Sequence, residues 1–477
     1  MKNNVVIELS QELDNVLLPI KGSMPTWLSG TLVRNGPTQF SINGHQVGHW
    51  FDGLSMLNAF SFQNGQIKYS NKFLRSDAFD EVTEKGTLNY VGFASDPCRT
   101  LFKRLMTFFF PSSKYPIHNA NINVAKFAER YVALYETPLP VRFDFKTLAT
   151  LGVFDFKDPL PKSSCFESAH PHHECEKDEY INYIVDYGWN SKYIIYRLQK
   201  GSEERKILAE IPVDYPSYMH SFALTKHYII FVEYPFVVNP LDFALKNLPF
   251  IKNYQWKPER GTQFLVIDRK TGFVTFRKSI DAFFAFHHVN AYEKGNEIIL
   301  DIITYPDASI IDKLADHASM DLPSRSVKKG KEDFTISLKR FSISFDTGEI
   351  KSESIFNEVH ELPRIHPNYD GKPYRFVYAT DVRKPEGSND HRKIYKIDVK
   401  TKQVLSWEEK ECYPGEPVFI PDPRGVNEDD GVLMVVVIDL KEWRSFLLCL
   451  DAKNLLEIGR AEVPHQIPQG LHGQFFS

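Results

Sequence analysis

Short apolar runs recur along the chain and predict a protein built mainly of β-strands. The runs are rich in Val, Ile, Tyr and Phe, and they are either alternating or fully apolar over the length of a strand. Helical patterns are sparse by comparison, which favours an all-β fold. The clearest strands are predicted over residues 131–134, 180–185, 228–232, 263–267, 298–303, 374–378 and 432–438.

Several of these strands are followed by a turn that begins with Asp and continues to Thr, Asn or Gly. Asp accepts the local hydrogen bond of such a turn, and Gly supplies a positive φ. Asp346 and Asp398 are 52 residues apart, Asp398 and Asp451 are 53 apart, and the longer gaps before them leave room for insertions. This repeat predicts propeller blades, about six to eight of them. A pair of β-sandwiches with hairpins is the alternative.

Composition restricts the class of protein further. The chain is 42% hydrophobic and 25% charged, as in ordinary globular proteins, and no linker rich in Pro, Gly or Ser divides it. We therefore predict one domain over residues 1–477. The net charge of −4 provides no basic field for nucleic acid, so none is expected as a partner. The 37 Phe residues favour a roomy apolar interior and an apolar ligand.

The N-terminal residues and the cysteines predict a cytoplasmic protein. The five cysteines are scattered without the paired spacing of a zinc site or a disulfide framework, so reduced thiols are expected. Residues 1–11 lack the apolar core of a signal peptide. The longest strongly apolar run, residues 431–438, is far shorter than the roughly 18 residues that a membrane-spanning helix needs.

One segment, residues 96–110, has a clear helical pattern. Asp96 is suited to cap the helix and Pro97 to stand in its first turn. Basic side chains beside bulky apolar ones suit a helix in a membrane interface, and a lid helix packed on the propeller is the alternative. The apolar residues predicted to dock on the membrane are Leu101, Phe102, Leu105, Phe108, Phe109 and Phe110.

Four of the 16 histidines stand out because each borders an apolar segment or a glycine turn: His170, His220, His287 and His472. Four neutral imidazoles suit a borderline metal such as Fe(II) and leave coordination positions open for dioxygen. A ligating histidine also needs an acceptor on its other ring nitrogen. Glu136, Glu361 and Glu416 are candidates for this role, although hydrogen-bonded core histidines and exposed glutamates would give the same local pattern.

Several motifs in the same order resemble the carotenoid cleavage oxygenase family, and the resemblance runs nearly from end to end. The motifs are GTLVRNGP at residues 30–37, HWFDG at 49–53, the four histidine segments, EDDG at 428–431 and LHG at 471–473. The resemblance implies an all-β, seven-bladed β-propeller with a few helices and loops that form a cap over the metal-containing face.

The resemblance also implies the metal site. One Fe(2+) per chain would be bound by His170, His220, His287 and His472, rather than by His172, His173 or His288. Glu136 would support His220, Glu361 would support His287, and Glu416 would support His472. No glutamate is implied for His170. Dioxygen would be the co-substrate.

Residues 96–98 (DPC) and 286–293 (FHHVNAYE) are similar to the animal-type branch of the family, which includes the β-carotene oxygenases and the isomerohydrolase of the retinal pigment epithelium. In that branch, the segment after DPC docks on the membrane at the mouth of the substrate tunnel. The resemblance therefore implies peripheral membrane association. Acylation of Cys98 stays open.

The activity implied is oxidative cleavage of a conjugated double bond of a carotenoid or apocarotenoid, with aldehyde or ketone products such as retinal. Phe51, Tyr135, Phe283 and Phe284 are candidates for the substrate tunnel, and propeller core is the other interpretation of each. The alternatives to this activity are a retinoid ester isomerohydrolase, a stilbene-cleaving oxygenase and a non-catalytic lipid-binding propeller.

Overall fold

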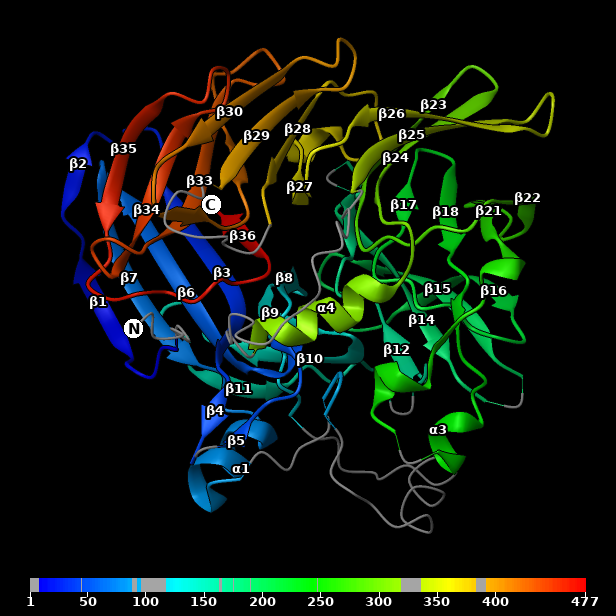
Figure 1. Cartoon of the computed structure of the whole chain (residues 1–477), viewed down its shortest axis with the longest axis horizontal. Coiled ribbons are helices and arrows are strands. Elements are labelled where there is room, and N and C mark those ends of the chain that lie inside the picture. The colour runs from blue at the N-terminus through cyan, green and yellow to red at the C-terminus, as the bar shows by residue number, and fades with distance from the viewer. Residues whose placement is uncertain are drawn as a thin grey trace, which may run out of the picture.

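The structure is a computed structural model that describes residues 8–43, 45–87, 92–95, 117–162, 165–174, 176–188, 190–246, 248–318, 336–382 and 392–477. Seven antiparallel sheets of four to six strands are arranged in a ring (Figure 1). The ring confirms the predicted all-β class and the seven-bladed propeller. Residues 96–110, with their predicted helix and all six predicted docking residues, lie outside the described residues.

The blades are numbered in chain order. Blade 1 contains β1 (Leu13–Leu17), β7 (Gln66–Phe73), β6 (Leu54–Gln63), β3 (Gly30–Gln39) and β36 (Gly473–Phe476). Blade 2 contains β8 (Asn123–Phe127), β9 (Arg130–Tyr135), β10 (Thr137–Phe143) and β11 (Thr150–Val153). Blade 3 contains β12 (Cys165–Glu167), β13 (His172–Glu174), β14 (Glu179–Asp186), β15 (Lys192–Gln199) and β16 (Lys206–Pro212).

Blade 4 contains β17 (Ala223–Leu224), β18 (Tyr228–Glu233), β21 (Thr262–Asp268) and β22 (Val274–Ile280). Blade 5 contains β23 (His288–Lys294), β24 (Glu297–Thr304), β25 (Ser337–Ser344) and β26 (Ile350–Phe356). Blade 6 contains β27 (Glu361–Arg364), β28 (Phe376–Thr380), β29 (Lys393–Asp398) and β30 (Val404–Glu408). Blade 7 contains β31 (Cys412–Pro414), β32 (Val418–Pro421), β33 (Gly431–Asp439), β34 (Arg444–Asp451), β35 (Glu457–Glu462) and β2 (Ile20–Gly22).

The remaining described elements lie in the connections. Two small hairpins pair β4 (Ser41–Ile42) with β5 (His45–Gln46) and β19 (Phe236–Val237) with β20 (Gln255–Trp256). The helices are α1 (Asp77–Lys85), α3 (Asp242–Leu245), α4 (Ser309–Ala318), and the 3-10 turns η1 (Trp50–Asp52), η2 (Phe250–Asn253), η3 (Pro258–Arg260) and η4 (Pro367–Tyr369). Helix α4, inserted between β24 and β25, crosses in front of the centre of the ring (Figure 1).

Both ends of the chain close the ring. The C-terminal strand β36 pairs with β3 of blade 1, with Thr31 opposite Phe476. The N-terminal strand β2 pairs with β35 of blade 7, with Ile20 opposite Ala461. Opening the ring at this seam would therefore break two separate strand pairings, one at each end of the chain.

The predicted turns account for the repeat. Four of them join the third and fourth strands of blades 2, 4, 5 and 6, and the fifth joins the equivalent strands β34 and β35 of blade 7, where β31 and β32 both pair with β33. In blade 4, Asp268 Oδ1 accepts hydrogen bonds from the backbone of Thr271 and from its hydroxyl, at 2.7 and 2.8 Å. The spacing of 52 and 53 residues is thus the length of one blade, and α4 explains the longer gap before Asp346.

The predicted strands agree with the structure except at residues 374–378, where β28 begins two residues later, at Phe376. The side chain of Glu428 accepts the backbone N–H groups of Arg375 and Phe376, both at 2.8 Å. The phenol of Tyr374 donates to Asp301 at 2.5 Å. These contacts hold the start of the apolar run outside the strand ladder.

Candidate metal centre

The four predicted histidines occupy equivalent places in four blades. His170 comes just before β13 in blade 3, and His220 comes just before β17 in blade 4. His287 directly precedes β23 in blade 5, and His472 directly precedes β36 in blade 1. Because the inner strands of all blades surround one axis, the four side chains converge. Each offers one ring nitrogen, and these nitrogens all lie within 4.8 Å of one another.

Two serines beside the histidines fix neighbouring histidine segments to each other. Ser168 Oγ donates to the backbone oxygen of His220 at 2.7 Å and accepts from the backbone of His170 at 3.1 Å. Ser221 Oγ donates to the carbonyl of Phe286 at 2.7 Å. The sequence prediction did not include these serines, although each lies within two residues of a predicted histidine.

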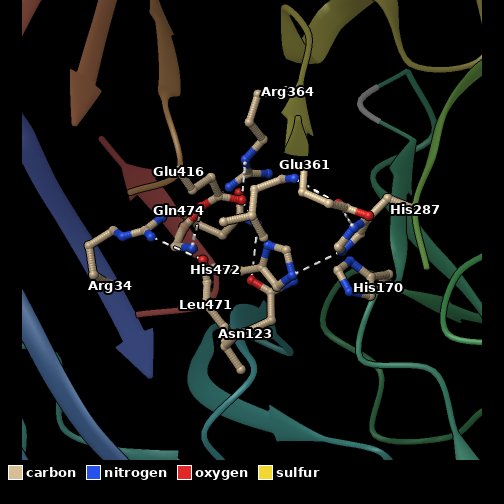
Figure 2. Close-up of polar contacts among 12 residues, drawn as sticks. Arg34, Asn123, His170, His287, Glu361, Arg364, Glu416, Leu471, His472 and Gln474 are labelled. Carbon is tan, nitrogen blue, oxygen red and sulfur yellow. Dashed lines mark hydrogen bonds and ion pairs between the residues drawn. The ribbon is translucent and has the colours of Figure 1, made fainter. Parts of the chain in front are cut away.

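Three of the rings are hydrogen bonded through Nδ1 to a buried glutamate. The Nδ1–carboxylate distance is 2.6 Å from His220 to Glu136, 2.5 Å from His287 to Glu361 and 2.7 Å from His472 to Glu416. These are the same three pairs that the family resemblance implies. Among the described residues, His170 has no carboxylate partner. Figure 2 shows His170, His287 and His472 close together, with Glu361 and Glu416 beside their partners.

The glutamates come from the three blades that supply no histidine. Glu136 lies between β9 and β10 of blade 2, Glu361 begins β27 of blade 6, and Glu416 lies between β31 and β32 of blade 7. Each of the seven blades therefore contributes one of these residues. A complete ring is needed to assemble the site.

Each glutamate is also held from behind. Tyr218 donates its phenol to Glu136 at 2.8 Å, and Tyr305 donates to Glu361 at 2.7 Å. These bonds fix the carboxylates in the orientation that accepts the Nδ1–H groups.

Of the three glutamates, Glu416 has the most charged surroundings. It forms ion pairs with Arg34 and with Arg364 Nε, the latter at 3.0 Å (Figure 2). Burial alone would raise the pKa of Glu416, but the two guanidinium groups outweigh burial and hold the pKa well below its usual range. Arg34 lies in the GTLVRNGP motif, and Arg364 Nη2 also donates to the backbone oxygen of Gly473.

The donor set fits a metal ion. A histidine that donates Nδ1–H to a carboxylate presents the lone pair of Nε2. His170 Nε2 lies 2.9 Å from His220 Nε2, and His287 Nε2 lies 3.3 Å from His472 Nε2. Two nitrogens bound at right angles to one ion, at about 2.1 Å each, lie about 3.0 Å apart. Burial and the neighbouring rings hold the pKa of His170 well below its usual range, which keeps that ring neutral and able to bind metal.

The four residues predicted for the substrate tunnel differ in their positions. Phe51 lies in η1, and its ring centroid is 6.4 Å from that of Phe286. Tyr135 is half-buried, and Phe283 and Phe284 are buried in the apolar core. Phe286 lies closer to the histidines, 5.6 Å from His220 between centroids, and the sequence prediction missed it although it directly precedes His287.

A cavity of about 560 Å³ reaches three of the four histidines, namely His170, His287 and His472. Polar and charged side chains line much of it, among them His172, Asp370 and Arg364. None of the four predicted tunnel residues is among its described lining. The assignment of these four residues to a substrate tunnel therefore stays a prediction.

Comparison with known proteins identifies the family. The family described as retinal pigment epithelial membrane protein matches residues 7–477. The chain belongs to this family. Its relatives include β,β-carotene 15,15'-dioxygenase of Gallus gallus, which is 32% identical over 96% of this chain and 94% of that protein. The mitochondrial carotenoid-cleaving dioxygenase of Macaca fascicularis is 31% identical over 95% of this chain and 90% of that protein.

Solved structures of carotenoid oxygenases agree with the fold. A mutant of the Synechocystis apocarotenoid oxygenase matches with a TM-score of 0.82 and 28% identity, covering 98% of this chain and 97% of that one. A cobalt-substituted form of the Synechocystis protein matches with a TM-score of 0.81, 28% identity and the same coverage. These comparisons confirm the predicted family and the predicted enzyme class, carotenoid cleavage dioxygenase. No helix in the described ranges has the length and apolar character needed to cross a membrane.

Proposed function

We propose that the protein is an Fe(II)-dependent dioxygenase that cleaves a conjugated carbon–carbon double bond of a carotenoid or apocarotenoid into aldehyde or ketone products. The observation that carries this proposal is the convergence of four histidine nitrogens, three of them backed by buried glutamates. The dioxygenases among the relatives support the substrate class. When bound, Fe(II) would supply the redox chemistry of the reaction with dioxygen.

The chain's own contribution is to hold the ligands and to place aromatic rings beside two of them. The glutamates accept Nδ1–H, so the opposite ring nitrogens stay free of protons and available to the ion. Phe286 lies beside His220 and His287, and Phe51 packs behind it. Such aromatic surfaces suit a long polyene and exclude water from the reacting bond.

The test is anaerobic reconstitution with Fe(II), followed by incubation with β-carotene or an apocarotenal in detergent under ¹⁸O-labelled dioxygen. Products are separated by chromatography and their mass is measured. His287→Ala should abolish iron binding and cleavage. His288→Ala is the matched control, because this adjacent half-buried ring hydrogen bonds to Ser221 and does not belong to the four-histidine cluster.

The products distinguish the possible outcomes. Retinal alone from β-carotene would mean central cleavage, and a longer apocarotenal with an ionone fragment would mean eccentric cleavage. Hydrolysis and isomerisation of a retinyl ester without incorporated label would instead identify an isomerohydrolase. A wild-type protein that binds no iron would overturn the four-histidine site.

We also propose that the protein is cytoplasmic, as its scattered cysteines indicate, and that it associates peripherally with membranes, because carotenoids reside in lipid. The DPC motif at residues 96–98 and the apolar residues of 101–110 support membrane association. Replacing Phe108, Phe109 and Phe110 by Ser should release the protein from liposomes in a sedimentation assay. Phe273→Ser, at an exposed phenylalanine in a turn of blade 4, is the control. Unchanged binding of the triple variant would contradict the proposal.

A further inference from the structure

The HWFDG motif at residues 49–53 contributes no metal ligand, yet it contains two deeply buried polar side chains. His49 is 2% exposed and Asp52 is 1% exposed. His49 caps the 3-10 turn η1, and Asp52 is the last residue of that turn. Burial of a carboxylate is costly unless hydrogen bonds satisfy it. The partners of these two residues therefore indicate what the motif does.

Asp52 is enclosed by one short segment, residues 92–95. Its Oδ1 accepts the backbone N–H of Phe93 at 2.6 Å. Its Oδ2 accepts the backbone N–H of Ala94 at 3.0 Å and the hydroxyl of Ser95 at 2.7 Å. A Cβ atom on Gly92 would lie 2.3 Å from Asp52 Oδ1, so glycine is required for the backbone to wrap this closely. One carboxylate thus fixes the path of this segment.

His49 holds a second segment, helix α4. Its Nδ1 accepts the backbone N–H of Phe51 at 3.1 Å, so the proton of the neutral ring is on Nε2. Nε2 then donates to the backbone oxygen of Ile311 in α4 at 3.0 Å. Burial lowers the pKa of His49 to about 4, which keeps this tautomer neutral near pH 7. Two residues of a single turn therefore anchor both residues 92–95 and α4.

The anchored segment is connected to the metal centre through a series of aromatic contacts. Phe93 packs on Phe51 with 5.3 Å between centroids, and Phe51 packs on Phe286 at 6.4 Å. Phe286 in turn lies 5.6 Å from His220. We call Phe51, Phe93 and Phe286 the aromatic wall. Its contacts run from Phe93 through Phe51 of the HWFDG motif to Phe286 beside His220.

A second path of contacts joins Phe93 to the same histidine. Its ring is 6.0 Å from that of Tyr218, whose hydroxyl donates to Glu136. Glu136 accepts the Nδ1–H group of His220. The position of Phe93 is thereby tied to the carboxylate that orients a candidate metal ligand.

We propose that Asp52 and His49 are positioning residues that hold the aromatic wall against the four histidines and thereby determine which double bond of a polyene lies beside them. The inference rests on the proposed function, because it requires a long apolar substrate. The double bonds along a polyene are chemically similar and offer no hydrogen bonds. The enzyme can therefore select one of them only through the position in which the aromatic wall holds the substrate. A misplacement of about 1 Å changes a reaction rate by about 100-fold.

The test uses Asp52→Asn, Ser95→Ala and Phe93→Leu in the iron-loaded protein. Ser95→Ala removes a single donor to Asp52, so it keeps the test informative if Asp52→Asn does not fold. Asp398→Asn is the matched control, since Asp398 is also buried and accepts two backbone N–H groups, but in an outer turn of blade 6. Four quantities are measured: the ratio of products from neighbouring double bonds, kcat, KM and iron content.

A binding measurement is independent of turnover. Trp50 lies 5.7 Å from Phe51 between ring centroids, so quenching of tryptophan fluorescence by an apocarotenal reports its Kd in the metal-free protein. For Asp52→Asn we expect the share of products from neighbouring bonds to rise about fivefold or more, and Kd and KM to rise about threefold to tenfold. Iron content should match wild type, because no metal ligand is changed.

Two results would overturn the inference while leaving the proposed function intact. One is a wild-type product ratio and Kd in Asp52→Asn, Ser95→Ala and Phe93→Leu, measured alongside an active wild type. The other is an equal change of product ratio in Asp398→Asn, which would make the effect one of general stability. A wild-type protein that binds iron but neither binds nor cleaves carotenoids would overturn the proposed function instead, and the inference with it.

Discussion

At the scale of residues, the glutamates behind the histidines decide which ring nitrogen carries a proton. Glu136, Glu361 and Glu416 each accept Nδ1–H from one ring and are themselves held by hydroxyl or guanidinium groups. The ring orientation is thus set before any ion binds. Metal affinity should depend on these carboxylates although they are not ligands.

Glu136→Gln should lower the affinity for Fe(II) by about 10- to 100-fold, because a neutral amide is a weaker acceptor for Nδ1–H of His220. The measurement is iron bound per chain after dialysis against defined free Fe(II). Glu167→Gln is the control, since Glu167 is buried and accepts from Tyr196 at 2.5 Å. An equal loss of affinity in Glu167→Gln would show that the effect does not act through His220.

Ionisation of Asp52 should make the free energy of unfolding depend on pH. Burial raises its pKa from 3.8 to about 6, and hydrogen bonds from residues 93–95 only partly oppose this. Between these two values the folded protein binds a proton that the unfolded chain releases. The contribution of Asp52 to stability therefore falls as pH rises through this window, by about 3 kcal/mol in total.

The variant Asp52→Asn does not titrate at this position. Its free energy of unfolding relative to wild type should therefore increase as pH rises from about 4 to 7. Urea unfolding at a series of pH values measures the difference, in which other ionisable groups largely cancel. A difference that stays constant across this range would contradict the shifted pKa of Asp52.

At the scale of elements, the turn that is repeated in five blades shows which backbone conformation this connection requires. In all five turns the residue after Thr or Asn has a positive φ, whether or not it is glycine. These residues are Leu148 (φ 56°), Gly272 (76°), Gly348 (65°), Lys402 (61°) and Leu455 (58°). The antiparallel pairing of the two strands imposes this conformation on side chains that do not favour it.

Two substitutions test the free-energy cost of a positive φ at a residue other than glycine. Lys402→Gly should stabilise the protein by about 0.5–1 kcal/mol, since a left-handed conformation strains lysine more than glycine. Gly348→Ala should destabilise it by about 1 kcal/mol, because φ is positive there while nothing lies within 4 Å of the added Cβ. Urea unfolding measures both changes. Shifts of the same sign in the two variants would contradict the conformational explanation.

At the scale of the whole molecule, ring closure and metal binding depend on the same strand. β36 closes blade 1 at the C-terminus, and His472 directly precedes it. His170, His220 and His287 belong to blades 3, 4 and 5. An ion bound by all four would connect the closing strand to the opposite side of the ring.

Metal removal should therefore lower thermal stability. Free Fe(II) at 100 times its Kd adds about 2.7 kcal/mol to the free energy of unfolding if it binds only the folded state. The Tm of wild type should rise when Fe(II) is added anaerobically, and His472→Ala should lose this increase. His288→Ala should retain it. An increase of equal size in His472→Ala would mean that the ion does not bind at the four-histidine site.

The sequence by itself determined the features that depend on neighbouring residues. The alternation of apolar positions predicted the strands, and the spacing of Asp346, Asp398 and Asp451 predicted the length of a blade, because pleating and turn chemistry act over a few residues. The motifs were also sufficient to identify the family and to name four histidines and three glutamates. The roles assigned to the segment 96–110 stay predictions.

Only the tertiary structure decided which of these residues meet. His287 and His472 are 185 residues apart, and Arg34 and Glu416 are 382 apart, so no local pattern could show these contacts. Strand 374–378 begins late because distant Glu428 takes two of its N–H groups. The contacts of Phe93 with Asp52 and of Phe51 with Phe286 likewise join residues that are far apart in the sequence. Closure of the ring brings one residue of every blade to the axis, which is the physical reason the site exists only in the complete fold.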